Sequence, residues 1–254
     1  MAERGCKVIE IQTFSNNDIH YNNDVPVLTR DHIDAITEEI LQKTIPHALT
    51  KQAPVDVELL VEEYFDLHLD YQTLQPDGAI LGETIFLQGV REVYDYNSLE
   101  PRKIYVNPRT IILDDTMCDV MPTRAKFTLA HEFGHWMLHQ VFYSYSSSRA
   151  CRSHRNQKTH FSHCNAKTPI QWTEWQANNF ASSLLLPRDC LRITLREFLE
   201  EHSTTWKKLS DFSDYRNREK YDTLLKKIAQ IYEVSYETAR IRMNKLCGTE
   251  YPHV

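Results

Sequence analysis

The stretch FTLAHEFGHWMLH, from Phe127 to His139, decides how this sequence folds. Its three histidines, at positions 131, 135 and 139, are four residues apart, and a glutamate follows the first of them. Apolar residues recur around them at spacings of three and four, which is typical of a helix with one buried stripe. The spacing predicts a helix from about Thr123, with a stripe formed by Phe127, Ala130, Gly134, Met137, Leu138 and Val141.

His131, Glu132 and His135 fit the pattern H-E-x-x-H. Residues four apart lie on one face of a helix, about 6 Å apart along its axis. Two imidazoles at that spacing can share one zinc ion at roughly 2.0–2.1 Å, and Glu132 can then act as general base toward a water molecule. The bare pattern also arises by chance in a histidine-rich chain. The convincing helix favours a site, as does Gly134, which costs about 1 kcal/mol relative to alanine and predicts a close neighbour.

A catalytic zinc site has three protein ligands and one open position. His139 starts about 12 Å along the axis from His131, too far to share the ion, so we expect it at the rim or behind a ligand. The better third ligand is Glu174, and Asn178, four residues later, can orient a ligand histidine. The alternative for Glu174 is a solvated charge on a helix face.

Glu174 lies on a second predicted helix, TPIQWTEWQANNFASSLLLP. Thr168 is a good N-cap, Pro169 suits the first turn, and Gln171 completes a capping box. Pro187 is expected to end the helix. The two helices together are predicted to hold all the metal ligands.

Length and composition fit one large domain, or a domain with a helical appendage. The chain has 254 residues, of which 41% are hydrophobic, and a net charge of −6. The negative charge argues against a general nucleic-acid binder. No apolar run approaches the roughly 18 residues of a membrane span, and the N-terminus lacks the apolar centre of a signal peptide, so we expect a cytoplasmic protein without membrane contact.

The predicted fold class is α+β, with a small, mostly antiparallel sheet packed on the HExxH helix and a helical C-terminal region. Four short segments rich in β-branched or aromatic residues predict the strands: LHLDYQTL, GAILGETIFLQG, REVYDY and KIYVNP. Pro108 places the last of them at an edge, where it could pair with an extended substrate. The expected divisions are an N-terminal arm and helix over 1–50, a central domain over 51–188 and a helical region over 189–254.

A basic segment separates the two ligand helices. From Ser144 to Lys167 it contains no acidic residue and five basic ones: Arg149, Arg152, Arg155, Lys158 and Lys167. Its position and charge predict a role in gating the cleft or docking an acidic protein surface. The segment also contains Cys151, His154, His160, His163 and Cys164, a set that either binds a second, structural zinc or merely belongs to a basic loop. The spacing matches no standard zinc pattern, which favours the loop.

The C-terminal sequence KKIAQIYEVSYETARIRMNKLCG predicts two helices joined by a short turn. Ser235 would cap the second helix and Gly248 would end it. A helix-turn-helix of this kind would present Arg240, Arg242 and Lys245 to DNA. Against DNA binding, Glu233 stands where such turns often have glycine. Packing or substrate docking is the favoured role for this region.

RAKFTLAHEFGHWMLH followed by EWQANNFASSLLLP resembles the ImmA/IrrE family of zinc metallopeptidases. The resemblance covers roughly Val55 to Leu186. It implies a zincin-like metallopeptidase domain over 51–188 with zinc as cofactor, held by His131, His135 and Glu174, and with Glu132 as the base. It also implies a protein substrate, typically a repressor or similar regulator.

Two other classes of function stay open on the sequence. One is a DNA-binding regulator, and the other a repressor-binding regulator, each with a non-catalytic zinc site. The residue that would stabilise an oxyanion is also open, with His139, Tyr143 and Tyr145 as candidates.

Overall fold

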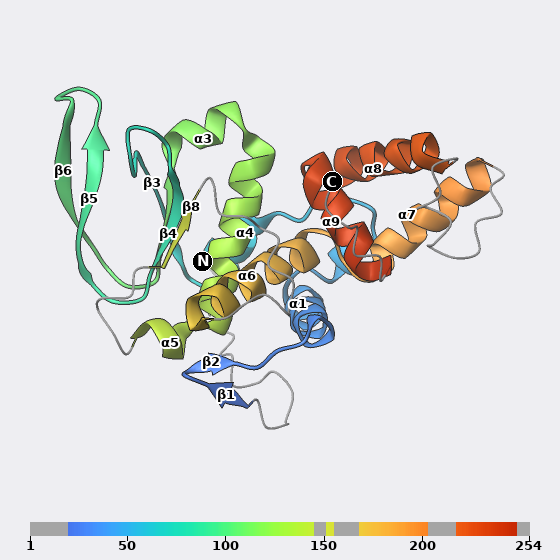
Figure 1. Ribbon diagram of the computed structural model, residues 1–254, viewed down its shortest axis with the longest axis horizontal. Helices are drawn as coiled ribbons and strands as arrows, with labels where there is room; N and C mark the ends of the chain where they lie inside the picture. Colours follow the sequence, from blue (N-terminus) through green and yellow to red (C-terminus); the bar gives the residue numbers. More distant parts are fainter. Residues whose placement is uncertain (1–19, 145–150, 155–167, 203–216, 248–254) are drawn as a thin grey trace, which may run out of the picture. The chain divides into compact units, whose positions relative to one another are not determined.

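The computed structural model describes residues 20–144, 151–154, 168–202 and 217–247. The chain divides into two compact units, one formed by residues 1–36 and 56–181 and the other by residues 37–55 and 182–254. Along the chain the elements are β1 (Tyr21–Asn22), β2 (Val25–Pro26), α1 (Arg30–Thr44), η2 (Pro46–Leu49), α2 (Val57–Leu59), η3 (Leu60–Tyr64), β3 (His68–Gln72), β4 (Ile80–Ile85), β5 (Gly89–Asp95), β6 (Glu100–Val106), β7 (Thr110–Asp114), α3 (Asp115–Val120), α4 (Pro122–Leu138), α5 (Gln140–Ser144), β8 (Cys151–His154), α6 (Pro169–Leu185), α7 (Arg188–Glu201), α8 (Arg218–Tyr232) and α9 (Tyr236–Cys247) (Figure 1).

The first unit is built on a four-stranded sheet in the order β3-β7-β4-β8. β3 and β7 are parallel, whereas β4 runs antiparallel to β7 on one side and to β8 on the other. The expected α+β class with a small, mostly antiparallel sheet is confirmed. The sequence did not predict β7, because its residues TIILD are buried on both faces and lack alternation.

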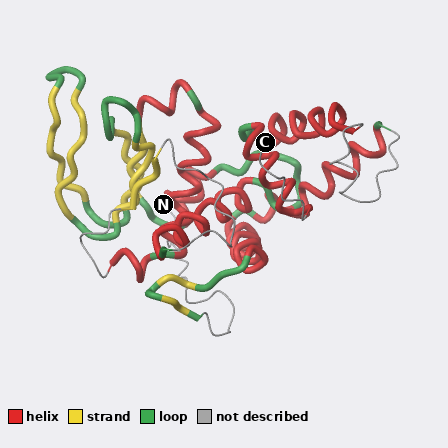
Figure 2. The backbone as a smooth tube through the Cα atoms, viewed as in Figure 1, coloured by secondary structure: helices red, strands yellow, loops and turns green. Residues whose placement is uncertain are grey.

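The strands β5 and β6 form a separate two-stranded sheet, drawn in yellow beside the four-stranded one in Figure 2. Val93 of β5 and Val106 of β6 belong to one buried cluster with Ile80, Ile85 and Ile112. The segment KIYVNP therefore lies in this hairpin, where β6 pairs with β5 over its full length. The edge strands of the main sheet are β3 and β8.

The helix α4 packs against the sheet along β4 and β7 (Figure 1). It is buried on more than one stripe, from Thr128 to His135 and again at Met137. The predicted stripe was wrong at Val141, which lies in α5 and is 42% exposed, and it omitted Phe133, which is fully buried. The helix is enclosed because the sheet covers one side of it and α6 lies against another.

The capping box of α6 forms as the sequence predicted. The Gln171 backbone N–H donates to Thr168 Oγ1 at 3.2 Å, and the Thr168 backbone N–H donates to Gln171 Oε1 at 3.2 Å. The close approach predicted at Gly134 is also present, because a Cβ there would lie 2.9 Å from Cδ1 of Phe180 on α6. Glycine in α4 thus lets α6 come close enough to bring Glu174 over the histidines.

In the second unit, α8 and α9 form the expected helix pair. Glu233 ends α8 in a left-handed conformation with φ of 52°, the geometry for which glycine is usual, and Ser235 Oγ caps α9 by accepting from Thr238 N–H at 3.0 Å. Gly248 lies outside the described residues.

The expected exposure of the basic side chains on α9 was partly wrong. Arg242 is 3% exposed, and its Nε donates to the Leu186 carbonyl at 3.1 Å. Arg240 is paired with Glu237 of the same helix at 2.6 Å. Arg242 therefore stabilises packing in the second unit and cannot read bases.

None of the helices in the described ranges has the length and apolar character that crossing a membrane requires.

Candidate metal centre

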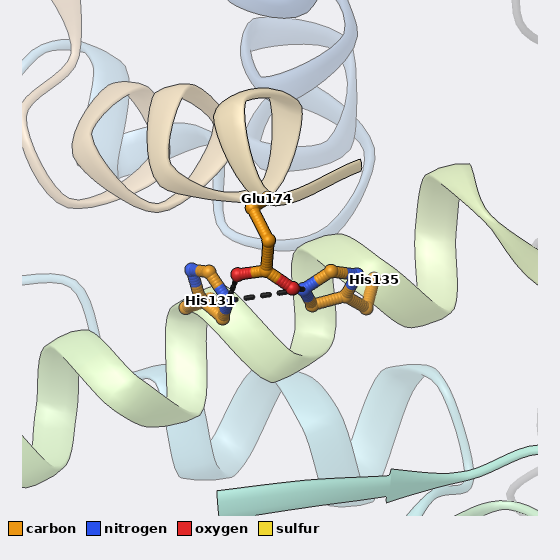
Figure 3. Close-up of side chains that lie close together, drawn as sticks. All are labelled: His131, His135 and Glu174. Atoms are coloured by element: carbon orange, nitrogen blue, oxygen red, sulfur yellow. Dashed lines mark hydrogen bonds and ion pairs between the residues drawn. The ribbon is translucent and has the colours of Figure 1, made fainter. Parts of the chain in front are cut away.

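Three buried side chains converge between α4 and α6 (Figure 3). His131 and His135 project from α4, and Glu174 reaches down from α6 between them. His131 Nε2 lies 3.3 Å from Glu174 Oε2, His135 Nε2 lies 3.2 Å from Glu174 Oε1, and the two Nε2 atoms are 3.0 Å apart. These are the three residues that the sequence predicted as ligands.

The ring of His131 is oriented from behind by Asn178, as the sequence predicted. The Nδ1–H of His131 donates to Asn178 Oδ1, at 3.2 Å, from the turn of α6 that follows Glu174. With the proton on Nδ1, the neutral ring presents a lone pair at Nε2 toward Glu174 and His135.

The ring of His135 is oriented by a chain of three hydrogen bonds. Gln176 Nε2 donates to the Pro26 carbonyl at 2.5 Å, which leaves Gln176 Oε1 as an acceptor for His139 Nε2–H at 2.8 Å. Burial and the neighbouring His135 lower the pKa of His139 well below its usual value, so its Nδ1 is an acceptor. His135 Nδ1–H then donates to it at 3.1 Å, and His135 Nε2 is left with a lone pair.

The donor set fits a metal cation. In tetrahedral zinc sites, bonds of about 2.0–2.2 Å place the ligand atoms about 3.2–3.6 Å apart, close to the separations found here. The Oε2 atom of Glu174 is buried and accepts no hydrogen bond. Two imidazole lone pairs and a carboxylate oxygen thus face one another in a buried space, which is unfavourable unless a cation lies between them. Among the described residues this is the cluster with metal-binding geometry.

The charges inside the cluster shift two pKa values. Burial alone would lower the pKa of His131, but the Glu174 carboxylate, whose Oε2 lies 3.3 Å from His131 Nε2, outweighs it and raises that pKa. Burial alone would raise the pKa of Glu174, but His135 and His131 hold it well below its usual range. The carboxylate is therefore ionised at neutral pH, as a metal ligand must be.

The Glu132 side chain is fully buried, its carboxylate contacts the strands β4 and β8, and its negative charge helps to raise the pKa of the neighbouring His131. Thr84 of β4 donates to Glu132 Oε2 at 2.6 Å, and Ser153 of β8 hydrogen-bonds to Glu132 Oε1. Gly82 makes room for this arrangement, because a Cβ there would lie 3.0 Å from both Glu132 Cγ and Thr128 Cγ2. Both carboxylate oxygens are held by hydroxyl groups of the two strands.

The sequence did not identify Thr84, Ser153 or Gln176 as residues of this region. Gln176 could have been identified from the sequence as a residue near the ligands, because it lies two residues from Glu174 on a helix that the sequence predicted. Thr84 and Ser153 carried none, since their role depends on which strands pair beside α4.

The Cys/His segment does not form the second metal site that the sequence left open, as far as its described residues show. Cys151 and Ser153 point to the buried side of β8, whereas Arg152 and His154 alternate to the other side. A strand places residues three apart on opposite faces, so the pair of Cys151 and His154 cannot bind one ion. The remaining residues of the segment, Arg149, Arg155, Lys158, His160, His163, Cys164 and Lys167, lie outside the described residues.

The candidates for an oxyanion donor differ in whether they have a proton to donate. His139 uses both ring nitrogens in the hydrogen-bond chain and has no N–H to offer. Tyr143 is buried with its hydroxyl 3.2 Å from Thr173 Oγ1, and burial raises its pKa well above 10, so it keeps its proton. Tyr145 lies outside the described residues.

Comparison with known families agrees with this geometry. The IrrE N-terminal-like domain, a peptidase family model, matches residues 94–244, which include all three cluster residues and Glu132. No curated protein sequence matches the chain. The match covers more than half of the 254 residues, and the chain belongs to the family of IrrE N-terminal-like peptidase domains.

Proposed function

We propose that this protein is a zinc-dependent endopeptidase that cleaves a regulatory protein, such as a transcriptional repressor. The observation that carries the proposal is the buried convergence of His131, His135 and Glu174 on one point, with Glu132 adjacent in sequence. Membership of a peptidase family supports the reaction class. Two imidazoles and one carboxylate with an open fourth position are typical of catalytic rather than structural zinc.

Zinc, when bound, supplies Lewis-acid chemistry, polarising the scissile carbonyl and lowering the pKa of water toward about 7. Glu132 accepts a proton from the attacking water at its carboxylate while the water oxygen bonds to the carbonyl carbon. Glu132 then gives that proton to the leaving nitrogen as the carbon–nitrogen bond breaks. One water is consumed, and a carboxylate and an amine are produced.

The remaining residues of the centre position these groups. Asn178 and the chain from His139 through Gln176 fix the orientation and tautomer of the two histidines. Tyr143 is the donor that we propose for the oxyanion, because burial and then the nearby charges, that of the ligand Glu174 among them, raise its pKa and keep its hydroxyl protonated.

The alternative of a DNA-binding regulator with a non-catalytic metal site is less well supported. A DNA-binding regulator of this kind needs basic side chains that are free to enter a groove of the DNA. Arg242 is buried and Arg240 is paired within its own helix. These two observations favour the peptidase.

The substrate class can be tested by incubating the zinc-loaded protein with candidate repressors and mapping any fragments by mass spectrometry. We expect one or a few specific cuts in a regulator, which chelation of the metal abolishes and added zinc restores. If the regulators stayed intact while unrelated peptides were cut, the protein would still be a peptidase, but the proposal that it cleaves a regulator would be rejected.

A further inference from the structure

The strand β4 lies next to the glutamate of the H-E-x-x-H pattern. Thr84 of β4 donates to the Glu132 carboxylate at 2.6 Å, and a Cβ at Gly82 would touch Glu132. An extended peptide that paired with β4 on this side would therefore pass close to the group that is expected to act as base. Peptides bind in this way to exposed sheet edges, because the backbone hydrogen bonds are independent of sequence.

Both sides of β4 are taken in this structure. A strand offers hydrogen bonds on two sides, and β7 occupies one of them. β8 occupies the other, running antiparallel to β4 with Ser153 opposite Gly82, Arg152 opposite Glu83 and Cys151 opposite Thr84. No backbone edge of β4 is left for a peptide while β8 is in place.

The side chains of β8 also engage Glu132. Ser153 hydrogen-bonds to Glu132 Oε1, and the Cys151 thiol lies 4.0 Å from Glu132 Oε2. Glu132 is fully buried beneath them. A general base must be within hydrogen-bond reach of the proton it abstracts, and here β8 fills that position.

A polar contact on the opposite face fastens β8 to the sheet. Arg152 Nε lies 2.8 Å from Glu83 Oε2, and Glu83, which is 1% exposed, is also paired with Arg91 at 2.6 Å. Arg152 is one of the basic residues that the sequence assigned to docking an acidic protein, but its partner is this internal carboxylate. β8 is thus held by backbone pairing, by Glu132 on one face and by Glu83 on the other.

We propose that β8 is an internal stand-in for the substrate, which blocks the site until it leaves the edge of β4. This proposal rests on the proposed peptidase function and adds its regulation. The occupant that replaces β8 is an extended peptide paired antiparallel to β4. A protein held in this way stays inactive toward peptides that are too weak to displace its own strand.

A reversible lock tests the proposal. Glu83→Cys together with Arg152→Cys places two thiols directly opposite each other on the face away from Glu132, at a spacing suited to a disulfide. Mass mapping confirms the bond, and a phosphine reductant opens it without removing zinc. Two probes are titrated against the zinc-loaded protein: acetohydroxamate, which needs only the metal, and a tetra-alanyl hydroxamate, which also needs a free strand edge.

The oxidised lock is expected to weaken binding of the tetra-alanyl hydroxamate by roughly tenfold or more, since the competent fraction falls. Acetohydroxamate should bind equally in both states, and reduction should restore the peptide probe. Equal binding of the peptide probe in both states would overturn the role of β8 and leave the peptidase intact. Failure of both probes in the reduced protein would reject the metal-site function and this proposal together.

A second variant guards against a lock that disturbs folding. Arg152→Glu sets a like charge against the buried Glu83 and is expected to tighten the tetra-alanyl probe by about threefold, the scale of one ion pair. Lys103→Glu, on the exposed part of β6, makes the same charge change away from β8 and should leave binding unchanged. Unchanged or weaker binding in Arg152→Glu counts against the proposal.

Discussion

The Nδ1 atoms of His135 and His139 lie 3.1 Å apart, and His139 is tied through Gln176 to the carbonyl of Pro26. A histidine that is not a ligand thus sets the tautomer of one that we propose as a ligand. This chain of hydrogen bonds leads from Pro26 in β2 to the ligand candidate His135.

His139→Ala is expected to weaken zinc affinity by about 10- to 100-fold, the range typical for loss of a group that orients a ligand histidine. His139→Asn keeps an acceptor near the Nδ1 position and should recover part of the loss. Competition with a chromogenic chelator measures both affinities. Wild-type affinity in His139→Ala would show that the hydrogen-bond chain is only structural.

Glu174→Ala should lose most of its zinc, because the site then keeps two imidazoles and no anionic ligand. Metal analysis after dialysis against a weak chelator measures the content. Glu219→Ala, an exposed glutamate of α8, is the matched control and should retain one zinc per chain. Full zinc in Glu174→Ala would remove Glu174 from the site.

Gly134→Ala is expected to lower the free energy of unfolding by about 1–3 kcal/mol, because its Cβ would press on Phe180 at 2.9 Å. The better helix propensity of alanine offsets about 1 kcal/mol at most. Gly89→Ala is the control, since its Cβ would meet only the flexible end of Arg91. Urea unfolding measures the free energy of unfolding of both variants and of wild type. A Gly134→Ala variant as stable as wild type would show that α4 and α6 do not need this close approach.

Zinc is expected to stabilise the protein more at pH 8 than at pH 6. In the metal-free protein the raised pKa of His131 gives stability that is full below about 6.5 and is lost as the pH rises through its folded pKa. The depressed pKa of Glu174 gives stability that is present above about 4.3 and is lost as the pH falls through its folded pKa. In the metal-free protein the pair of His131 and Glu174 therefore stabilises the fold most between about pH 4.3 and pH 6.5. In that range zinc has to displace the proton on His131.

Thermal unfolding of metal-free and zinc-loaded protein at the two pH values tests this expectation. The rise in Tm on loading should be larger at pH 8. An equal or smaller rise at pH 8 would show that His131 carries no proton for the metal to displace.

The sequence predicted what depends on local spacing. The ligand candidates His131 and His135, the capping box at Thr168 and the close neighbour of Gly134 each follow from residues a few positions apart on a helix. Glu174 was predicted from its place on the next helix and from the family resemblance. Val141 was misplaced because α4 ends at Leu138 and a new helix begins at Gln140. A stripe cannot be extended across such a break.

What the sequence could not predict depends on which strands pair. TIILD lacks alternation because β7 is buried on both faces, and CRSH is a strand only because β4 offers it an edge. Arg242 has the residue type and spacing of a DNA contact, but its exposure is set by Leu186, 56 positions away in the chain. Hydrogen bonds between distant segments leave no periodic trace in a sequence.

The most direct test of the account compares wild type with Glu132→Gln on a peptide library prepared from digested cellular protein, with zinc content measured in the same samples. Glutamine is nearly isosteric and can still bond to Thr84 and Ser153, but it cannot accept the proton from water. We predict that Glu132→Gln keeps its fold and one zinc per chain and produces no new peptide termini, while wild type does. Cleavage by Glu132→Gln within a few-fold of wild type would contradict the role of Glu132 and with it the proposed mechanism.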